Sequence, residues 1–240
     1  MKKFTCIIPS RYKSTRFDGK SLAMIHGKPM ILWVAEHANK SSSISRTVVA
    51  TDDKRIFDAV NEAGYEVVET PDCPNGSARV AHVAKNIDGE WVFEMQGDQP
   101  MVTPEVIDDF IERAWQMIEK NPDIDVVIPY APATKEHTDS LDVLKVVKTE
   151  NDRLVFQTRQ PIQTGWRTLG LYLWKRTALL RFADLPVSDI ERVEDSHPIR
   201  LYVNDFYVQG LLIEDTSWVE VDREHQIAEV EILMKEKRIV

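Results

Sequence analysis

The sequence predicts an α/β fold built around a mostly parallel sheet. In its first half, short β-branched runs alternate with longer stretches of helical period, which is the pattern of repeated βαβ units. After about Pro132, strand-like runs follow one another directly, which indicates a small antiparallel part beside the parallel sheet. The chain has 240 residues, of which 43% are apolar, and this is enough for one large domain with a sizeable core.

The first half of the chain carries most of the predicted sheet. Its strands are apolar runs bounded by turn residues: Phe4–Pro9, Thr47–Thr51, Glu66–Glu69, Val92–Gln96 and Val126–Pro129. Its helices have proline in the first turn, glycine just past the end, or an apolar face of helical spacing: Pro29–Asn39, Lys54–Ala63, Ser77–Asn86 and Pro104–Lys120.

The second half is predicted to begin with strands. The predicted strands are Val143–Lys148, Leu154–Arg159, Thr168–Lys175 and Phe206–Ile213, and the short helices are Ala178–Ala183 and Asp189–Val193. The chain closes with the segment Trp218–Val221 and an amphipathic helix over Arg223–Glu236.

Charge and cysteine content limit the partners and the compartment. With 39 acidic and 30 basic side chains the net charge is -9, which argues against nucleic acid and confines anion binding to a local basic cluster. Cys6 lies in an apolar run and Cys73 in a loop, so we expect no disulfide framework and a cytoplasmic location. No segment approaches the roughly 20 apolar residues that cross a bilayer, so we expect no membrane partner.

A basic loop follows the first predicted strand, over residues 9–20. It contains four cations and three aliphatic hydroxyl groups, at the carboxyl end of a strand, where open α/β sheets bind ligands. Arginine forks onto phosphate oxygens and lysine supplies a compact charge, so the composition suits a triphosphate; a solvated charged loop is the alternative. Walker A and Gly-x-Gly-x-x-Gly motifs are absent, which argues against a P-loop enzyme and a nicotinamide-dependent oxidoreductase.

Further motifs follow in a fixed order: Gly27-Lys28-Pro29-Met30-Ile31, Val49-Ala50-Thr51-Asp52-Asp53 and Gln96-Gly97-Asp98-Gln99-Pro100. With the basic loop, they make the chain resemble the 3-deoxy-manno-octulosonate (Kdo) cytidylyltransferases, also called CMP-Kdo synthetases. The resemblance is dense to about residue 110 and collinear beyond, for example at residues 144–147, 156–159 and 169–172.

The resemblance implies a fold, a reaction and a cofactor. The fold is a Rossmann-like nucleotidyltransferase domain over residues 1–240, with a nucleotide-binding core (about 1–130 and 206–240) and an acceptor and dimerisation lobe (about 131–205). The reaction is Mg²⁺-dependent transfer of CMP from CTP to a 2-keto-3-deoxy sugar acid, with release of pyrophosphate, for surface polysaccharide (lipopolysaccharide) biosynthesis. A homodimer is also implied, for which Val155 and the apolar strand residues 171–174 are candidate contacts.

The resemblance also implies roles for single residues. Catalytic roles fall to Lys20, Arg11 and Arg16, and metal ligands are Asp98 and Asp222. The nucleotide would be bound by Pro9, Ser10, Arg11, Ser14, Lys20, Thr51, Asn75, Gly76, Ser77, Arg79, Gln96 and Asp98, and the acceptor by Gln99, Arg159 and Thr168. Taken alone, Asp98 suits an Asx-turn, Asp222 a helix N-cap and Arg79 a helix surface.

The chain departs from the family in the acceptor half. A histidine of the family is Thr168 here, and a glutamine is Pro198, which cannot make the side-chain bond and is expected to perturb a helix there. We therefore expect altered acceptor specificity rather than lost chemistry. The acceptor is Kdo, a related acid or another small anion such as a phosphonate; a non-catalytic nucleotide-binding regulator is the alternative. The sequence offers no physical reason for Asp18, where the family has proline.

Overall fold

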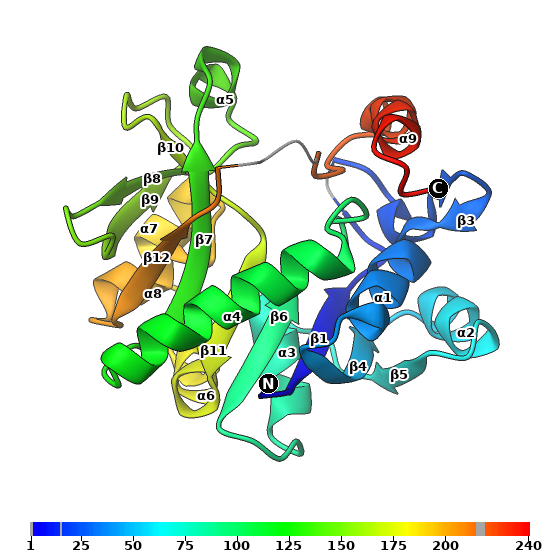
Figure 1. Ribbon diagram of the computed structural model, residues 1–240, viewed down its shortest axis with the longest axis horizontal. Coiled ribbons are helices and arrows are strands. Elements are labelled where there is room, and N and C mark those ends of the chain that lie inside the picture. Colours follow the sequence, from blue (N-terminus) through cyan, green and yellow to red (C-terminus); the bar gives the residue numbers. More distant parts are fainter. Residues whose placement is uncertain (1, 15, 215–218) are drawn as a thin grey trace.

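The computed structural model, which describes residues 2–14, 16–214 and 219–240, is centred on a ten-stranded mixed sheet (Figure 1). The strands, in chain order, are β1 (Phe4–Ser10), β4 (Ile44–Thr51), β5 (Glu66–Glu69), β6 (Trp91–Met95), β7 (Val126–Pro132), β8 (Lys145–Lys148), β9 (Leu154–Thr158), β10 (Trp166–Thr168), β11 (Leu171–Lys175) and β12 (Val208–Leu212). They lie in the order β5-β4-β1-β6-β11-β7-β10-β8-β9, and β12 pairs with β7. The predicted α/β fold class is confirmed.

The strands β5, β4, β1 and β6 are parallel, and their carboxyl ends meet at one edge of the sheet. At this edge Ser10 is the register partner of Thr51. The segments that follow β1, β4 and β6 therefore come together, as the topology of an open α/β sheet requires for a ligand site.

The antiparallel strands continue the same sheet. Strand β11 lies antiparallel between β6 and β7, and β10 pairs with the other end of β7 and with β8. The predicted single strand Thr168–Lys175 is wrong, because it is two strands separated at Gly170. An added Cβ at Gly170 would lie 2.6 Å from Nε2 of Gln99, so glycine allows the chain to pass close to that side chain. The division into core and acceptor lobe stays a prediction.

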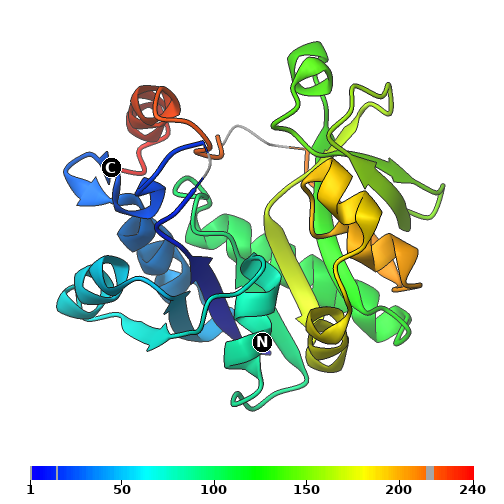
Figure 2. The same ribbon diagram turned by 180° about the vertical axis from the view of Figure 1, so that it is seen from behind.

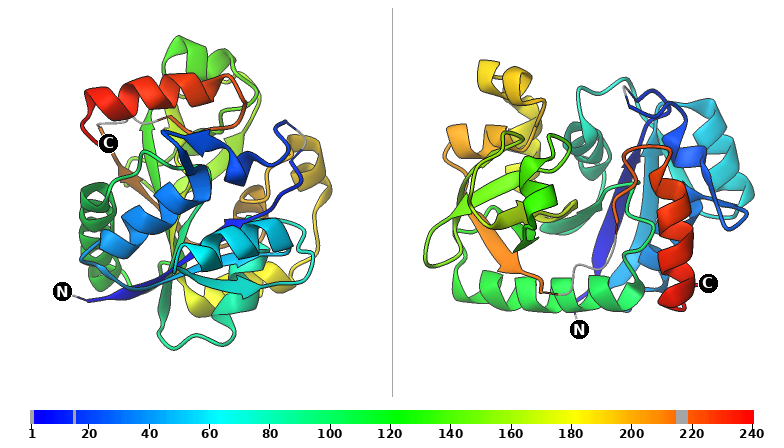
Figure 3. Two further views of the ribbon diagram at one scale, coloured as in Figure 1. Left: turned by 90° about the vertical axis from the view of Figure 1, so that its right-hand side faces the viewer. Right: turned by 90° about the horizontal axis from the view of Figure 1, so that it is seen from above.

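Helices cover both faces of the sheet (Figures 1 and 2). Helices α1 (Met30–Lys40) and α4 (Pro104–Lys120) pack on one face, and α3 (Gly76–Ala84) and α6 (Arg176–Asp184) on the other. Helix α2 (Lys54–Glu62) packs on β4 and β5. The C-terminal helix α9 (Gln226–Glu236) lies near the hairpin formed by β2 (Met24–Ile25) and β3 (Lys28–Pro29) (Figure 3).

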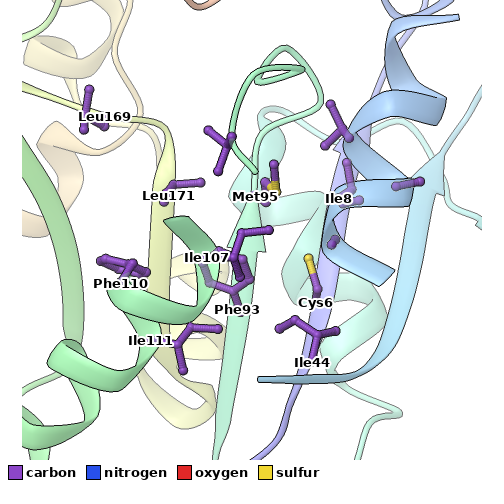
Figure 4. Packing of buried hydrophobic residues seen from close by; sticks show 14 of the residues in the cluster. Cys6, Ile8, Ile44, Phe93, Met95, Ile107, Phe110, Ile111, Leu169 and Leu171 are labelled. Carbon is purple, nitrogen blue, oxygen red and sulfur yellow. The ribbon is translucent and has the colours of Figure 1, made fainter. Parts of the chain in front are cut away.

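Strict alternation of side chains sorts β1 and β6 between two buried clusters. Cys6 and Ile8 face the cluster beneath α1 and α4, together with Phe93 and Met95 (Figure 4), and Ile7 faces the opposite cluster. Each fully buried large apolar side chain contributes roughly 1.5–3 kcal/mol to folding. The same alternation directs the side chain of Glu94, which lies between Phe93 and Met95, toward the face covered by α3 and α6.

Several short elements were not predicted. They are the 3₁₀ helix η1 (Lys20–Leu22), the β2–β3 hairpin, α5 (Lys135–Asp139) and α8 (Ile199–Val203). The expectation that Pro198 perturbs a helix is wrong, because Pro198 is the N-cap of α8, a position where the missing N–H costs no helical hydrogen bond. The predicted helices at 178–183 and 189–193 are α6 and α7 (Asp189–Glu194).

The end of the chain differs from prediction in one boundary. Helix α9 begins at Gln226 and not at Arg223. Trp218, in the predicted closing segment, lies outside the described residues. Cys6 and Cys73 are free thiols, as predicted. Within the described ranges, the helices are all too short or too polar to cross a membrane.

Candidate active site

The basic loop after β1 is closed by its own backbone. The N–H of Gly19 donates to the carbonyl of Tyr12 (2.9 Å), and the N–H of Ser14 donates to the Asp18 carboxylate (2.9 Å). Gly19 has φ 71°, and an added Cβ would lie 3.0 Å from the Tyr12 ring, so both conformation and space require glycine. Asp18 therefore has a structural role, which the sequence did not reveal: it fixes the turn that presents the loop's cations.

Lys20 stands between two carboxylates from distant parts of the chain. Its Nζ lies 2.7 Å from Oδ2 of Asp98, after β6, and 3.5 Å from Oδ1 of Asp222, before α9. Arg16 lies 3.0 Å from the same oxygen of Asp222. Burial lowers the pKa of Lys20, but the two carboxylates outweigh it and raise the pKa above its usual value, so Lys20 is charged at neutral pH. The structure thus brings three predicted catalytic and metal-binding segments together.

A hydrogen bond between backbone groups holds the Asp98 and Asp222 segments side by side. The N–H of Val221 donates to the carbonyl of Asp98 (3.1 Å), and the Gln226 side chain accepts from the N–H of Asp222 (2.7 Å). The N-cap of α9 is His225, so the alternative that Asp222 only caps the last helix is wrong. Its carboxylate is instead directed to Lys20 and Arg16.

The two carboxylates fit a magnesium ion. Burial and the neighbouring charge of Asp98 both raise the pKa of Asp222, because like charges in one place oppose ionisation. A divalent cation relieves that repulsion, and carboxylate oxygens are ligands that Mg²⁺ prefers. In the described part of the chain no third acid, histidine or cysteine completes a metal site. Asp98 and Asp222 would hold the ion, with phosphate oxygens and water as the remaining ligands.

Asp142, in the segment between α5 and β8, reaches the same site. It lies 3.0 Å from Nη1 of Arg16 and 2.8 Å from Nε of Arg223. The hydrogen bond from Arg223 has the largest effect on the pKa of Asp142, and it lowers that pKa. Nothing in the sequence marks this acid, which joins the basic loop to the start of the antiparallel strands.

The predicted Arg79 is not on a helix surface. It is 3% exposed, donates to Asp52 (2.6 Å) and also contacts Thr70. Thr51 is buried as well, and its carbonyl accepts from the N–H of Thr70 (2.8 Å). Arg79 thus ties the segment after β4 to the loop before α3, and direct contact with the pyrimidine stays a prediction.

The residues predicted to surround the base lie together at the start of α3. The Asn75 side chain caps α3 by accepting from the N–H of Ala78 (2.8 Å). An added Cβ at Gly76 would lie 3.1 Å from Oε1 of Gln96 and 3.3 Å from Pro9, so the glycine allows a close approach. In the basic loop Ser10 is buried and bonds to Ser21 (2.8 Å), and Arg11 is exposed.

Beneath the predicted base site lies a buried acid that the sequence reading missed. Glu94, in β6, accepts hydrogen bonds from Ser77 (2.8 Å), Gln96 (2.5 Å) and the Trp174 indole (2.8 Å). Burial raises its pKa to about 7, although the three donors favour the charged form. His197 contacts Ser77 from the other side (3.1 Å), and burial lowers its pKa to about 3.

The pKa of Glu94 predicts a stability difference that depends on pH. The unfolded chain loses this proton near pH 4.5 and the folded chain only near 7, so rising pH destabilises the fold across that window. Glu94→Gln removes the titration. Its free energy of unfolding relative to the wild type should therefore increase by up to about 3 kcal/mol between pH 5 and pH 8. Urea unfolding of both proteins across this range measures it, and a constant difference would contradict it.

The three predicted acceptor residues are placed differently. Arg159 donates to the carbonyls of Asp142 (2.7 Å) and Asp195 (3.1 Å), so backbone groups occupy part of its guanidinium. Gln99 is 1% exposed, and its amide faces the Glu220 carboxyl, an interaction that acts to lower the pKa of Glu220. In the described part of the chain this amide makes no well-aligned hydrogen bond. Thr168 is half-buried at the end of β10.

Arg167, which precedes Thr168, is a functional candidate that the sequence did not distinguish. It is 7% exposed, and among described residues its Nε has no hydrogen-bond partner. Burial lowers its pKa, and the nearby carboxyl of Glu220 partly offsets this. Glu220 in turn faces Asp98 and Gln99. Among the described residues, a buried cation without an ion-paired carboxylate therefore lies near Glu220, which in turn adjoins Asp98 and Asp222.

Comparison with known proteins shows which proteins this chain resembles. The family model described as cytidylyltransferase matches residues 5–239. The 3-deoxy-manno-octulosonate cytidylyltransferase of Leptospira biflexa serovar Patoc is 34% identical, over 96% of this chain and 94% of that protein. The enzyme of the same name from Bdellovibrio bacteriovorus is 31% identical, over 97% and 98%. The chain also resembles a solved CMP:2-keto-3-deoxy-manno-octonic acid synthetase complexed with CTP, with a TM-score of 0.87, 26% identity, and coverage of 98% and 100%.

Proposed function

The chain belongs to the cytidylyltransferase family, and on this basis we propose that it transfers CMP from CTP to a 2-keto-3-deoxy sugar acid such as 3-deoxy-manno-octulosonate. The observation that carries the proposal is the position of Lys20 between Asp98 and Asp222, beside the basic loop at the carboxyl edge of the sheet. This arrangement offers fixed cations for a triphosphate and oxygen ligands for a metal ion.

In the proposed reaction a hydroxyl oxygen of the acceptor attacks the α-phosphorus of CTP. The hydroxyl proton is released to solvent, the bond from the α-phosphorus to the bridging oxygen breaks, and pyrophosphate leaves with the electron pair of that bond. Lys20 and Arg16 stabilise the charge that develops on the phosphate oxygens, and the basic loop aligns the chain of phosphates. Mg²⁺ held by Asp98 and Asp222 would supply further charge neutralisation. Little covalent chemistry by the protein is needed.

The acceptor's carboxylate is assigned to Arg167. This guanidinium is buried, its Nε has no hydrogen-bond partner among the described residues, and it lies near Glu220. The Arg159 guanidinium, in contrast, is partly occupied by backbone carbonyls. Gln99, whose amide faces Glu220 and makes no well-aligned hydrogen bond among the described residues, is suited to bind a hydroxyl group of the same acceptor.

Arg167→Met is expected to raise the KM for the sugar acid by about 10- to 100-fold, because a charge-assisted hydrogen bond is lost. The KM for CTP should stay within about twofold, since Arg167 does not belong to the CTP-binding loop. Arg167→Lys keeps the charge, so its KM for the sugar acid should lie between those of the wild type and Arg167→Met. A rise in the KM for CTP of the same size would contradict the assignment.

Pyrophosphate release with CTP, Mg²⁺ and a panel of acidic acceptors tests the function. Release with 3-deoxy-manno-octulosonate supports the proposal, and release only with an amino-substituted acid or a phosphonate would change the acceptor. Tight CTP binding with no release for any acceptor would favour a nucleotide-binding regulator.

The homodimer stays a prediction, with fewer candidate contacts than the sequence offered. Leu171, Tyr172, Leu173 and Trp174 are buried in the core, and Val155 on β9 is 43% exposed. Light scattering that gives only the 27.6 kDa species would count against a dimer.

A further inference from the structure

Glu94 is fixed by groups from three elements. It is fully buried on β6, and it receives the Ser77 hydroxyl from α3, the Trp174 indole from β11 and the Gln96 amide from the segment after β6. The indole N–H and the amide NH₂ are groups that only donate, so the carboxylate is their matching partner.

This arrangement sets the orientation of the Gln96 amide. Nε2 of Gln96 donates to Oε1 of Glu94 (2.5 Å), and Oε1 of Gln96 is therefore turned toward Gly76 at the start of α3. Within the described residues this oxygen accepts no hydrogen bond, and it is not among the buried polar atoms that lack a partner, so it is accessible to a ligand. The base site thus presents a hydrogen-bond acceptor whose direction is fixed from beneath.

We propose that Glu94 is a positioning residue that makes the protein select cytosine over uracil, by holding the Gln96 carbonyl oxygen toward the exocyclic group of the base. Cytosine carries an amine donor at that position, and uracil carries a carbonyl acceptor. The Gln96 oxygen accepts from the amine, whereas it opposes the uracil carbonyl oxygen. This inference rests on the proposed function in that the nucleotide is CTP.

Glu94→Gln reverses the Gln96 amide without changing the shape of the site. The introduced amide satisfies the Trp174 N–H with its oxygen, and its NH₂ then donates to the Ser77 hydroxyl and to the Gln96 oxygen. Gln96 must rotate, so that its own NH₂ faces the base. The opposite orientation of the introduced amide leaves two donors facing each other at Trp174, which is unfavourable in a buried site.

The experiment measures CTP and UTP binding by calorimetry with Mg²⁺, at a pH one unit or more above the pKa of Glu94. The wild type should prefer CTP, and Glu94→Gln should reduce the ratio of the two dissociation constants by about 10- to 100-fold, with tighter UTP binding. The double variant Glu94→Gln/Gln96→Glu restores an acceptor toward the base and should restore the preference for CTP. Trp174→Phe removes only the indole donor, and it should lower the melting temperature without changing the ratio.

Two results would overturn the inference: equal binding of both nucleotides by the wild type, or a folded Glu94→Gln protein whose CTP preference is within twofold of the wild type. Neither depends on an acceptor or on turnover. Failure of the proposed function is seen separately, as a wild type that binds neither nucleotide or that binds CTP and releases no pyrophosphate.

Discussion

Replacing Lys20 by methionine is expected to lower kcat by about 1000-fold, near the upper range for removing one fixed donor from a developing negative charge. Lys20 is 15% exposed and charged, and it contacts both carboxylates of the proposed metal site. Methionine keeps the aliphatic stem of the side chain and removes only the ammonium group. Single-turnover formation of the CMP product at saturating CTP measures the chemical step.

The fold of the Lys20→Met protein should persist, with a melting temperature that is lower without Mg²⁺ and recovers when Mg²⁺ and CTP are added. The ammonium group separates Asp98 from Asp222, so its loss leaves the two like charges with only Arg16 beside Asp222 until a metal ion binds. Lys54→Met, at an exposed site on α2, is the matched control for one lost charge. A decrease in kcat of less than about tenfold would exclude the catalytic role.

Asp98→Asn is expected to reduce kcat/KM for CTP by about 1000-fold, because a neutral amide is a poor ligand for Mg²⁺ and the second carboxylate alone holds the ion weakly. The side chain is 24% exposed and almost isosteric with asparagine, so the fold should be retained. Higher Mg²⁺ should restore only part of the activity.

A second measurement for Asp98→Asn does not depend on turnover. CTP with Mg²⁺ should raise the melting temperature of the wild type, since a ligand that binds only the folded state stabilises it, and this increase should be largely lost in the variant. Asp109→Asn, an exposed acid on α4, should keep both the activity and the increase. An unchanged Mg²⁺-dependent shift would contradict the assignment of Asp98 as a metal ligand.

The carboxyl edge of the parallel strands was predictable because its signals are local. The nearly continuous apolar runs of β1 and β6 predict strands that are buried on both faces, and parallel strands bring the segments after them to one edge. Lys20 and Asp98 therefore meet as a consequence of topology. The metal-binding role of Asp222 was predicted only from the family resemblance, because the sequence around Asp222 also suits a helix N-cap.

The remaining parts depend on contacts between distant segments. The sequence around Glu94 does not reveal the role of this carboxylate, because its hydrogen-bond partner Trp174 lies 80 residues away along the chain. Arg167 looks like any strand arginine until its burial is known. Pro198 was misread because a proline's effect depends on whether it starts a helix or lies inside one.

The salt bridges of Asp142 affect how a charged nucleotide binds to the site. Arg16 is already neutralised by Asp142 and Asp222, and Lys20 by Asp98 and Asp222, so these two groups do not act as bare cations on a chain of net charge -9. Binding of a triphosphate is then an exchange of anions, in which phosphate oxygens take over places held by carboxylates. Such an exchange gains little long-range attraction, so ionic strength should affect the association rate only weakly, and recognition occurs at contact distance.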